Sequence, residues 1–221
     1  MKEAPRSYVV IDTETNHYDK PFVLQMGFCQ VEDGEIVTTE SFDIMPPDDV
    51  FITDGAAKVH GLTKESLAKT GSAPEDIFPI IHETLNHFAS GCMMGQNFVF
   101  DTGALNNTFR RLGLEEIDFE AIPFIDVGVT FKAWRMMNEP EFGYNADAAR
   151  TEGMTLHEYF KWVRARRIRG LKWNIDYCMK AFGVDAPARG AHDAGEDCRL
   201  THLIYQKMCE RGIVEEVLFA K

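Results

Sequence analysis

Short runs of apolar and β-branched residues open the chain and are typical of strands. Residues 8–11 form the first run, residues 22–31 the second, and residues 35–44 the third. The second and third runs are separated by Asp33-Gly34, a dipeptide that favours a tight hairpin turn. The pattern therefore predicts an antiparallel meander of three strands.

Helical spacing of apolar residues dominates the rest of the chain. Short apolar runs at 92–95 and 122–125 interrupt it and predict two more strands. Residues 138–153 are polar and predict an irregular segment. Strands that alternate with helices indicate an α/β fold, in which a mixed central sheet is flanked by helices. The predicted helices cover residues 74–89, 97–112, 127–137, 155–168, 172–182 and 194–211.

The composition is that of a soluble globular protein. A chain of 221 residues with 45% hydrophobic and 26% charged residues favours one mid-sized domain over residues 1–221. The five cysteines contain no C-x-x-C pair, and the N-terminus shows no signal peptide, so we expect a protein of the reducing cytoplasm. No apolar run approaches the ~18 residues of a membrane span.

The formal net charge of −12 argues against a protein that coats nucleic acid by bulk attraction. It is compatible with an enzyme whose carboxylates hold cations, because bound metal ions supply positive charge at the site. One dense basic cluster departs from the acidic average, and it predicts either a grip for phosphate groups or a solvated helix face. The cluster consists of Lys161, Arg164, Arg166, Arg167, Arg169 and Lys172.

Two carboxylates lie at the end of the first predicted strand. Asp12 and Glu14 lie two residues apart at its end, so both side chains point to one side of the sheet. Carboxylates this close repel each other unless a cation lies between them. Taken alone, the D-x-E pattern is equally compatible with a strand that runs into a polar turn.

Two further acids interrupt apolar helical stripes. Asp101 lies on the apolar face of the helix after Asn97, and Asp197 begins the apolar face of the last helix. A carboxylate on an apolar stripe is costly unless it is paired or near a metal, although the helix dipole also favours an Asp in the first turn. Asp193 and Glu196 predict the cap and third position of the last helix, which leaves His192 in the preceding loop.

The placement of His192 decides whether it can join Asp197. Residues five positions apart are about 140° apart around a helix, so they share no helical face. With His192 outside the helix, its side chain and that of Asp197 can face one site. Alone, His192 is also compatible with a solvated loop histidine.

Together, these residues resemble the motifs of the DEDDh 3′–5′ exonuclease family, whose members include epsilon-type proofreading exonucleases and which belongs to the ribonuclease H-like superfamily. Residues 59–63 (VHGLT) resemble a family loop near the 3′ nucleotide, and Asp126 resembles a further family position. The chain departs from the family at Gln96, where histidine is usual, and in residues 131–170, a possible insertion. The motif segments are 11–15 (IDTET), 95–101 (GQNFVFD) and 192–197 (HDAGED).

The resemblance implies a fold and an activity. The fold is a ribonuclease H-like mixed sheet, with a three-strand antiparallel meander plus shorter parallel strands, flanked by helices. The activity is two-metal-ion hydrolysis at the single-stranded 3′ end of DNA or RNA, which releases nucleoside 5′-monophosphates. Mg²⁺ or Mn²⁺ suits ligands that are all carboxylates. The implied metal ligands are Asp12, Glu14, Asp101 and Asp197.

The resemblance also implies roles for individual residues. Asp12 would bridge both ions, Asp101 would hold the second, and His192 would deprotonate the attacking water. Thr13, His60, Asn97 and Phe98 are the implied substrate-binding residues. The rings of Phe22, Phe98 and His60 are candidates to stack on the terminal base, with core or loop packing as the alternative.

Three other functions are compatible with the same residues. The first is a catalytically silent nucleic-acid-binding module on this fold. The second is a proofreading subunit that acts with a polymerase or another replication or repair protein. The third is an enzyme specialised for very short RNA, similar to an oligoribonuclease.

Overall fold

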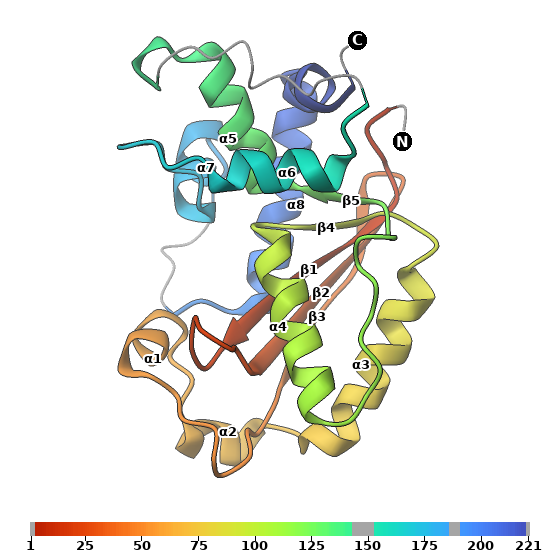
Figure 1. The fold of residues 1–221 in the computed structure, drawn as a ribbon, viewed down its shortest axis with the longest axis vertical. Coiled ribbons are helices and arrows are strands. Elements are labelled where there is room, and N and C mark those ends of the chain that lie inside the picture. Colours follow the sequence, from red (N-terminus) through yellow and green to blue (C-terminus); the bar gives the residue numbers. More distant parts are fainter. Residues whose placement is uncertain (1–2, 143–152, 186–190, 220–221) are drawn as a thin grey trace.

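The structure, a computed structural model, describes residues 3–142, 153–185 and 191–219. A five-stranded sheet lies at its centre, with the strand order β3-β2-β1-β4-β5 (Figure 1). The first three strands form an antiparallel meander, and the last two extend the sheet from β1 in parallel, so the predicted mixed sheet is confirmed. The strands are β1 (Tyr8–Thr15), β2 (Val23–Glu32), β3 (Glu35–Asp43), β4 (Met93–Gly95) and β5 (Phe124–Asp126).

Helices cover both faces of this sheet. Helices α3 and α4 pack on one face, and α8 packs along β1, β2 and β3 on the other (Figure 1). Helices α5 and α6 contact β5, and α5 and α7 contact α8. The helices are α1 (Asp54–His60), α2 (Lys64–Thr70), α3 (Pro74–Phe88), α4 (Phe98–Arg111), α5 (Val127–Asn138), α6 (Leu156–Ala165), α7 (Ile175–Phe182) and α8 (Ala194–Glu210).

The structure adds elements that apolar spacing did not predict. Helices α1 and α2 have seven residues each, too short to show a periodic stripe, and they begin at the caps Thr53 and Thr63. A single 3₁₀ turn (Pro140–Phe142) and a π-helical turn (Glu215–Phe219) complete the described elements. Of the segment 138–153 that we predicted to be irregular, residues 143–152 lie outside the described residues.

Several predicted boundaries were wrong. Strand β1 ends at Thr15 and not at Ile11, so Asp12 and Glu14 lie at the end of the strand, as predicted, but within it. Helix α6 ends at Ala165 and α7 begins at Ile175, which leaves residues 166–174 as an irregular connection. Asn97 occupies the cap position of α4, but its φ of 69° is left-handed and its side chain makes no cap hydrogen bond.

Among the described residues, no helix combines the length and the apolarity that crossing a membrane requires.

Candidate active site

A cavity of about 1190 Å³ opens beside β1, and the motif residues meet there. Strand β1, helix α4 and helix α8 each contribute to its lining. Its remaining wall comes from the connection 166–174 and from α7. The lining motif residues are Asp12, Glu14, Asp101, His192 and Asp197.

Helix α8 can approach β1 because strand β2 has a glycine, without a side chain, at the point of contact. Gly27 pairs with Asp12 in the sheet, and a Cβ atom on Gly27 would lie 2.2 Å from the carbonyl oxygen of Ala194. Beside it, the Gln25 side-chain oxygen accepts a hydrogen bond from the Ala194 N–H at 2.8 Å. The first turn of α8 is thereby held next to the two carboxylates of β1.

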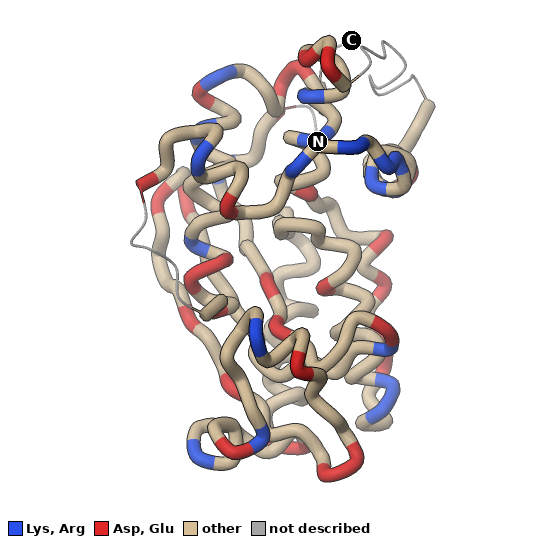
Figure 2. The backbone as a smooth tube through the Cα atoms, turned by 90° about the vertical axis from the view of Figure 1, so that its left-hand side faces the viewer, with Lys and Arg blue, Asp and Glu red and all other residues tan. Residues whose placement is uncertain are grey.

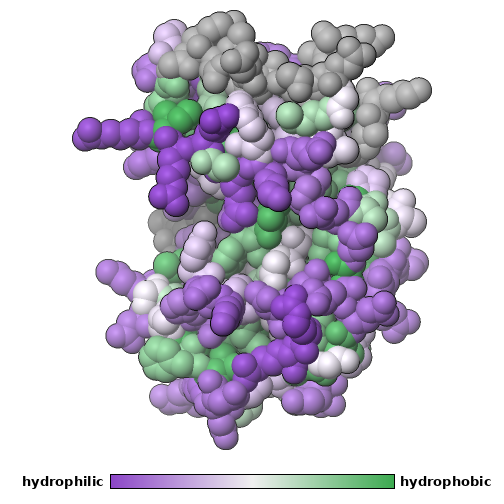
Figure 3. All heavy atoms as spheres, viewed as in Figure 1, coloured by the Kyte–Doolittle hydropathy of each residue, from purple (hydrophilic) through white to green (hydrophobic). Residues whose placement is uncertain are grey.

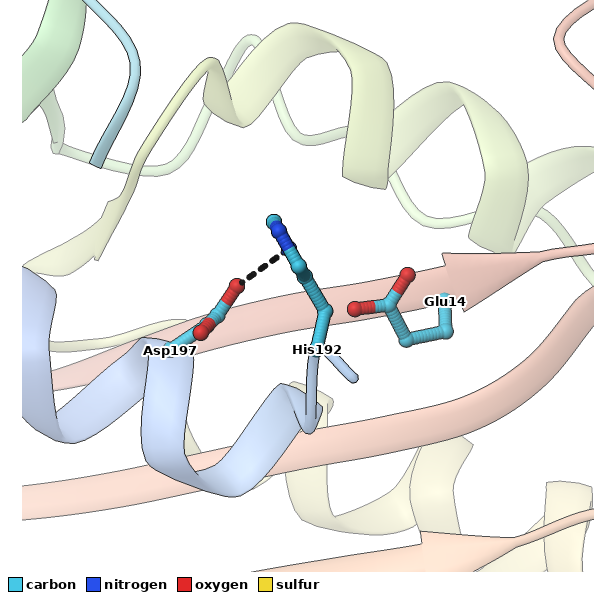
Figure 4. Close-up of side chains that lie close together, drawn as sticks. All are labelled: Glu14, His192 and Asp197. Carbon is cyan, nitrogen blue, oxygen red and sulfur yellow. Dashed lines mark ion pairs between the residues drawn. The ribbon is translucent and has the colours of Figure 1, made fainter. Parts of the chain in front are cut away.

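His192 and Asp197 contact each other at the start of α8. Asp193 caps the helix by accepting a hydrogen bond from the Glu196 N–H at 2.9 Å, so His192 lies outside the helix, as predicted. Its Nδ1 lies 3.2 Å from Asp197 Oδ2 (Figure 4). The imidazole is 33% exposed and the carboxylate 4%, which places the histidine between Asp197 and solvent.

Glu14 completes a small group with this pair. One ligand atom from each of Glu14, His192 and Asp197 lies within 4.8 Å of the other two. In Figure 4 the Glu14 carboxylate extends from β1 toward the histidine. Two carboxylates and an imidazole at this spacing have the geometry of a cation site.

Asp101 reaches the same cavity from α4. Its Oδ1 accepts hydrogen bonds from the Thr13 N–H at 3.0 Å and from the Thr13 hydroxyl at 2.7 Å. Burial nevertheless raises the pKa of Asp101 to about 8, with smaller contributions from the charges of Asp126 and Glu14. A carboxyl group with this pKa becomes a stable anion at neutral pH only when a cation is near. The carboxylate oxygens of Asp101 therefore suit a metal ion.

Asp126 supports the site from behind. Its Oδ1 accepts hydrogen bonds from the Asn97 N–H at 3.1 Å and the Val129 N–H at 2.9 Å, so it caps α5 and holds the left-handed turn at Asn97. Burial raises the pKa of Asp126 to about 6. The residue does not line the catalytic cavity, and its place is that of a positioning residue.

Of the four implied substrate-binding residues, Thr13 and Asn97 line the cavity. His60 and Phe98 do not. The Phe98 side chain is 1% exposed, and its ring stacks on Phe124 with 4.8 Å between centroids. Phe98 therefore packs in the core, which was the alternative to stacking on the terminal base.

His60 is buried beneath the loop that carries His192. Its Nε2 lies 3.2 Å from the Thr15 carbonyl oxygen, and its Nδ1 accepts a hydrogen bond from the Leu62 N–H at 3.0 Å. Burial lowers the pKa of His60, which favours a neutral ring that donates from Nε2. The neighbouring Val59 carbonyl accepts a hydrogen bond from the His192 N–H at 3.1 Å, so this segment supports the His192 loop.

The sequence motifs did not identify the opposite wall of the cavity. Trp173, Tyr177 and Lys180 line it, and they lie between the second and third motifs without a spacing that links them to either. Gln96, the departure from the family pattern, donates a hydrogen bond to the Trp173 carbonyl. Its side chain therefore ties the second motif to this wall.

Comparison with known proteins places the chain in a family. The exonuclease family profile (RNase_T) matches residues 9–150, more than half of the sequence. The chain belongs to this family, the DEDD-type 3′–5′ exonucleases of the ribonuclease H-like superfamily. The predicted fold class and family resemblance are confirmed.

One relative by sequence is the DNA polymerase III PolC-type of Lacticaseibacillus paracasei. It is 28% identical over 130 residues, which are 56% of this chain and 8% of the polymerase. Similar folds occur in the zinc-bound complex of E. coli exonuclease I with single-stranded DNA (TM-score 0.70, 18% identity) and in exonuclease I of Methylocaldum szegediense (0.67, 19%). Each comparison covers 93% of this chain and 40% of the solved chain.

Proposed function

We propose that this chain is a DEDDh-type, two-metal-ion 3′–5′ exonuclease that releases nucleoside 5′-monophosphates from single-stranded DNA or RNA. The observation that carries the proposal is the convergence of four carboxylates and His192 in one cavity. The exonuclease I relative crystallised with single-stranded DNA supports a single strand as the substrate.

The four carboxylates suit hard divalent cations. Asp12, Glu14, Asp101 and Asp197 would hold two Mg²⁺ or Mn²⁺ ions, because oxygen ligands favour these metals over softer ones. Bound there, the ions supply positive charge that stabilises the developing negative charge on the phosphate and promotes ionisation of the attacking water. The raised pKa of Asp101 supports this assignment, since a cation favours its charged form.

His192 is the base in this proposal. Its partly exposed ring stands at the cavity, where it can accept the proton of the attacking water. Asp197 Oδ2, 3.2 Å from Nδ1, orients the imidazole and stabilises its protonated form. Thr13 holds Asp101 by two hydrogen bonds and so fixes the position of that carboxylate.

The four implied substrate-binding residues divide into two kinds. Thr13 and Asn97 line the cavity and would contact the terminal nucleotide. His60 and Phe98 would act indirectly, through the His192 loop and the core under α4. We also propose a cytoplasmic location, because all five cysteines are free thiols.

The PolC-type relative favours a second candidate role, proofreading together with a polymerase. A pull-down with a replicative polymerase tests it. Polymerase-stimulated removal of a mismatched 3′ nucleotide would support this role, and absence of both binding and stimulation would reject it.

The main test is a digestion of matched DNA and RNA oligonucleotides, single- and double-stranded, labelled at the 5′ end. With Mg²⁺ or Mn²⁺, we expect a ladder of strands shortened one nucleotide at a time and nucleoside 5′-monophosphates as products. A chelator should stop the reaction, and a 3′-blocked strand should resist it. Internal cleavage, or turnover that persists in chelator, would reject the mechanism. Strand binding without any turnover would favour the silent binding module.

A further inference from the structure

The basic cluster of the sequence lies on α6 and the connection after it, where five of its six members line two further cavities and the sixth, Lys172, lines the catalytic cavity itself. Figure 2 shows Lys and Arg gathered in the upper half of the molecule, at the level of α6 and above, and Figure 3 shows hydrophilic side chains spread over α6. Among the described residues, no ion pair involves any of the six cluster members. The cluster therefore concentrates positive charge in a chain of net charge −12.

Two adjoining cavities turn this cluster into a groove. The first, of about 580 Å³, is lined by Lys161, Arg164 and Arg167 together with Tyr18. The second, of about 530 Å³, shares Arg164 and Arg167 with the first. Below, the basic groove means these two cavities and the five side chains of the basic cluster that line them, Lys161, Arg164, Arg166, Arg167 and Arg169.

The basic groove borders the catalytic cavity on two sides. Leu171 and Trp173 line both the second groove cavity and the catalytic cavity. On the other side, the 78% exposed ring of Tyr18 stacks on Phe100, which lines the catalytic cavity, with 5.5 Å between centroids. A strand that leaves the catalytic cavity therefore meets the groove directly, and the first groove cavity also contains one carboxylate, that of Glu120, 3.0 Å from His157 Nε2.

Contacts within the chain itself fix the backbone that carries the groove side chains. The buried ammonium of Lys132 donates to the carbonyl oxygens of Arg164 at 3.0 Å and Arg166 at 2.7 Å, at the C-terminus of α6. The Arg166 guanidinium lies over the Trp162 ring, 4.3 Å from its centroid. These contacts hold the connection after α6 in place, which is the preorganisation that a binding surface needs.

We propose that the basic groove binds the phosphodiester backbone of the strand upstream of the nucleotide being removed. This inference rests on the proposed exonuclease function. Exposed cations that line a groove give strand binding without sequence preference, because phosphate groups are present at every nucleotide. A short substrate occupies only the catalytic cavity, whereas a longer strand reaches the groove as well.

The test compares two charge-matched double variants. Lys161→Gln with Arg167→Gln removes two exposed cations of the groove and spares Arg164, whose charge affects the pKa values of buried Asp126 and Lys132. Lys69→Gln with Lys207→Gln removes the same charge from α2 and α8, at residues that line none of the described groove or catalytic cavities. Binding of a fluorescent oligonucleotide is measured in chelator across a salt series, and kcat/KM is measured for a long strand and a dinucleotide.

The groove variant should bind the long strand more weakly and with a flatter salt dependence. Removing one phosphate interaction lowers the slope of log K against log salt by about 0.7, so removing two lowers it by about 1.4. The ratio of kcat/KM for the long strand to that for the dinucleotide should fall, while the control variant keeps the wild-type slope and ratio.

An unchanged slope and ratio in the groove variant would overturn the proposal, and so would an equal loss on both substrates, which indicates a structural role. Binding in chelator is independent of cleavage. A wild type that binds with the steep slope but never cleaves would reject the exonuclease function alone. A wild type that cleaves both substrates with no difference between the variants would reject the groove alone.

Discussion

The proposed metal-binding carboxylates and the basic groove line neighbouring cavities, yet the fold holds them in opposite ways. The carboxylates of Glu14, Asp101 and Asp197 are buried and project from regular elements. The groove side chains of Arg166, Arg167 and Arg169 are exposed and come from an irregular connection. Like charges that are buried together cost free energy, whereas exposed cations are solvated and cost little.

This difference explains which region needs a rigid framework. The buried anions require fixed positions so that a cation can compensate them, and the sheet with α4 and α8 provides these positions. The groove needs only a stable backbone, which Lys132 provides, because hydrated side chains can adjust to a strand. We therefore expect substitutions in the two regions to fail in different ways.

The largest effect is expected from loss of a metal ligand. Asp12→Ala or Asp197→Ala should lower kcat more than ~10³-fold, since a bound ion contributes several kcal/mol to the transition state. The fold should remain, and without metal it should become slightly more stable, because one repelling charge is gone. Glu196→Ala is the matched control, since Glu196 lies in the same helical turn but pairs with Arg199. Near-wild-type turnover with Mg²⁺ in either ligand variant would contradict the metal assignment.

Removal of the proposed base should rank next. His192→Ala should lower kcat by roughly 10²–10⁴-fold while leaving the binding of Mn²⁺ and of a strand intact. Steady-state kinetics and calorimetric Mn²⁺ titration measure the two properties separately. A parallel loss of Mn²⁺ affinity would make His192 a ligand, as its place beside Glu14 and Asp197 also permits. Wild-type activity at neutral pH would exclude both roles.

At the basic groove, we expect substitution of buried Lys132 to destabilise the fold more than substitution of an exposed arginine. Lys132→Met leaves the Arg164 and Arg166 carbonyls without their donor and should lower the free energy of unfolding by about 1–3 kcal/mol. Arg169→Ala, on the exposed side of the groove, should stay within about 0.5 kcal/mol of wild type. Urea unfolding measures both. Equal stability of the two variants would show that Lys132 does not hold the groove.

The last prediction concerns pH and sharpens the contrast between the regions. Without metal, the pKa of Asp101 is about 8 in the folded chain against an ordinary value of 3.8, so the folded state binds the proton more tightly. The contribution of Asp101 to the free energy of unfolding is therefore fully present below pH 3.8. This contribution is lost as the pH rises to about 8. Asp126, whose pKa is raised to about 6, contributes with the same sign.

Asp101→Asn should flatten this dependence and raise Tm at pH 8 in chelator by a few degrees, at about 2–4 °C per kcal/mol for a chain of this size. Thermal unfolding at pH 5 and pH 8, with chelator and with Mg²⁺, tests it. Mg²⁺ should remove most of the pH dependence of the wild type. A wild-type Tm that rises between pH 5 and pH 8 in chelator would contradict the assignment.

Local sequence pattern predicted much of the fold. Alternating apolar runs and the Asp33-Gly34 turn predicted the meander, and the register of β1, β2 and β3 confirms it. The cap at Asp193 placed His192 outside α8, and the structure brings it to Asp197. Such features depend on neighbours a few residues away, which are visible in the chain itself.

Tertiary contacts decided the rest. Nothing near Gly27 indicates that α8 lies against it, 2.2 Å from where a Cβ atom would be. The predicted run of α6 to residue 168 was wrong, and a lysine from α5 instead binds the carbonyl groups at the end of that helix. His60 lies in a recognisable motif, yet the sequence does not show that the neighbouring Val59 carbonyl accepts a hydrogen bond from His192, more than a hundred residues later in the chain.

The sequence by itself therefore determined the five strands and six of the eight described α-helices, because periodicity and capping act over a few residues. It also indicated the acids that we propose to carry the chemistry. Only the tertiary structure decided that Trp173, Tyr177 and Lys180 line the catalytic cavity and that the basic cluster becomes a groove beside it. These neighbours meet through close packing between distant segments. Such packing depends on the shapes of all the elements together and leaves no periodic trace in any one of them.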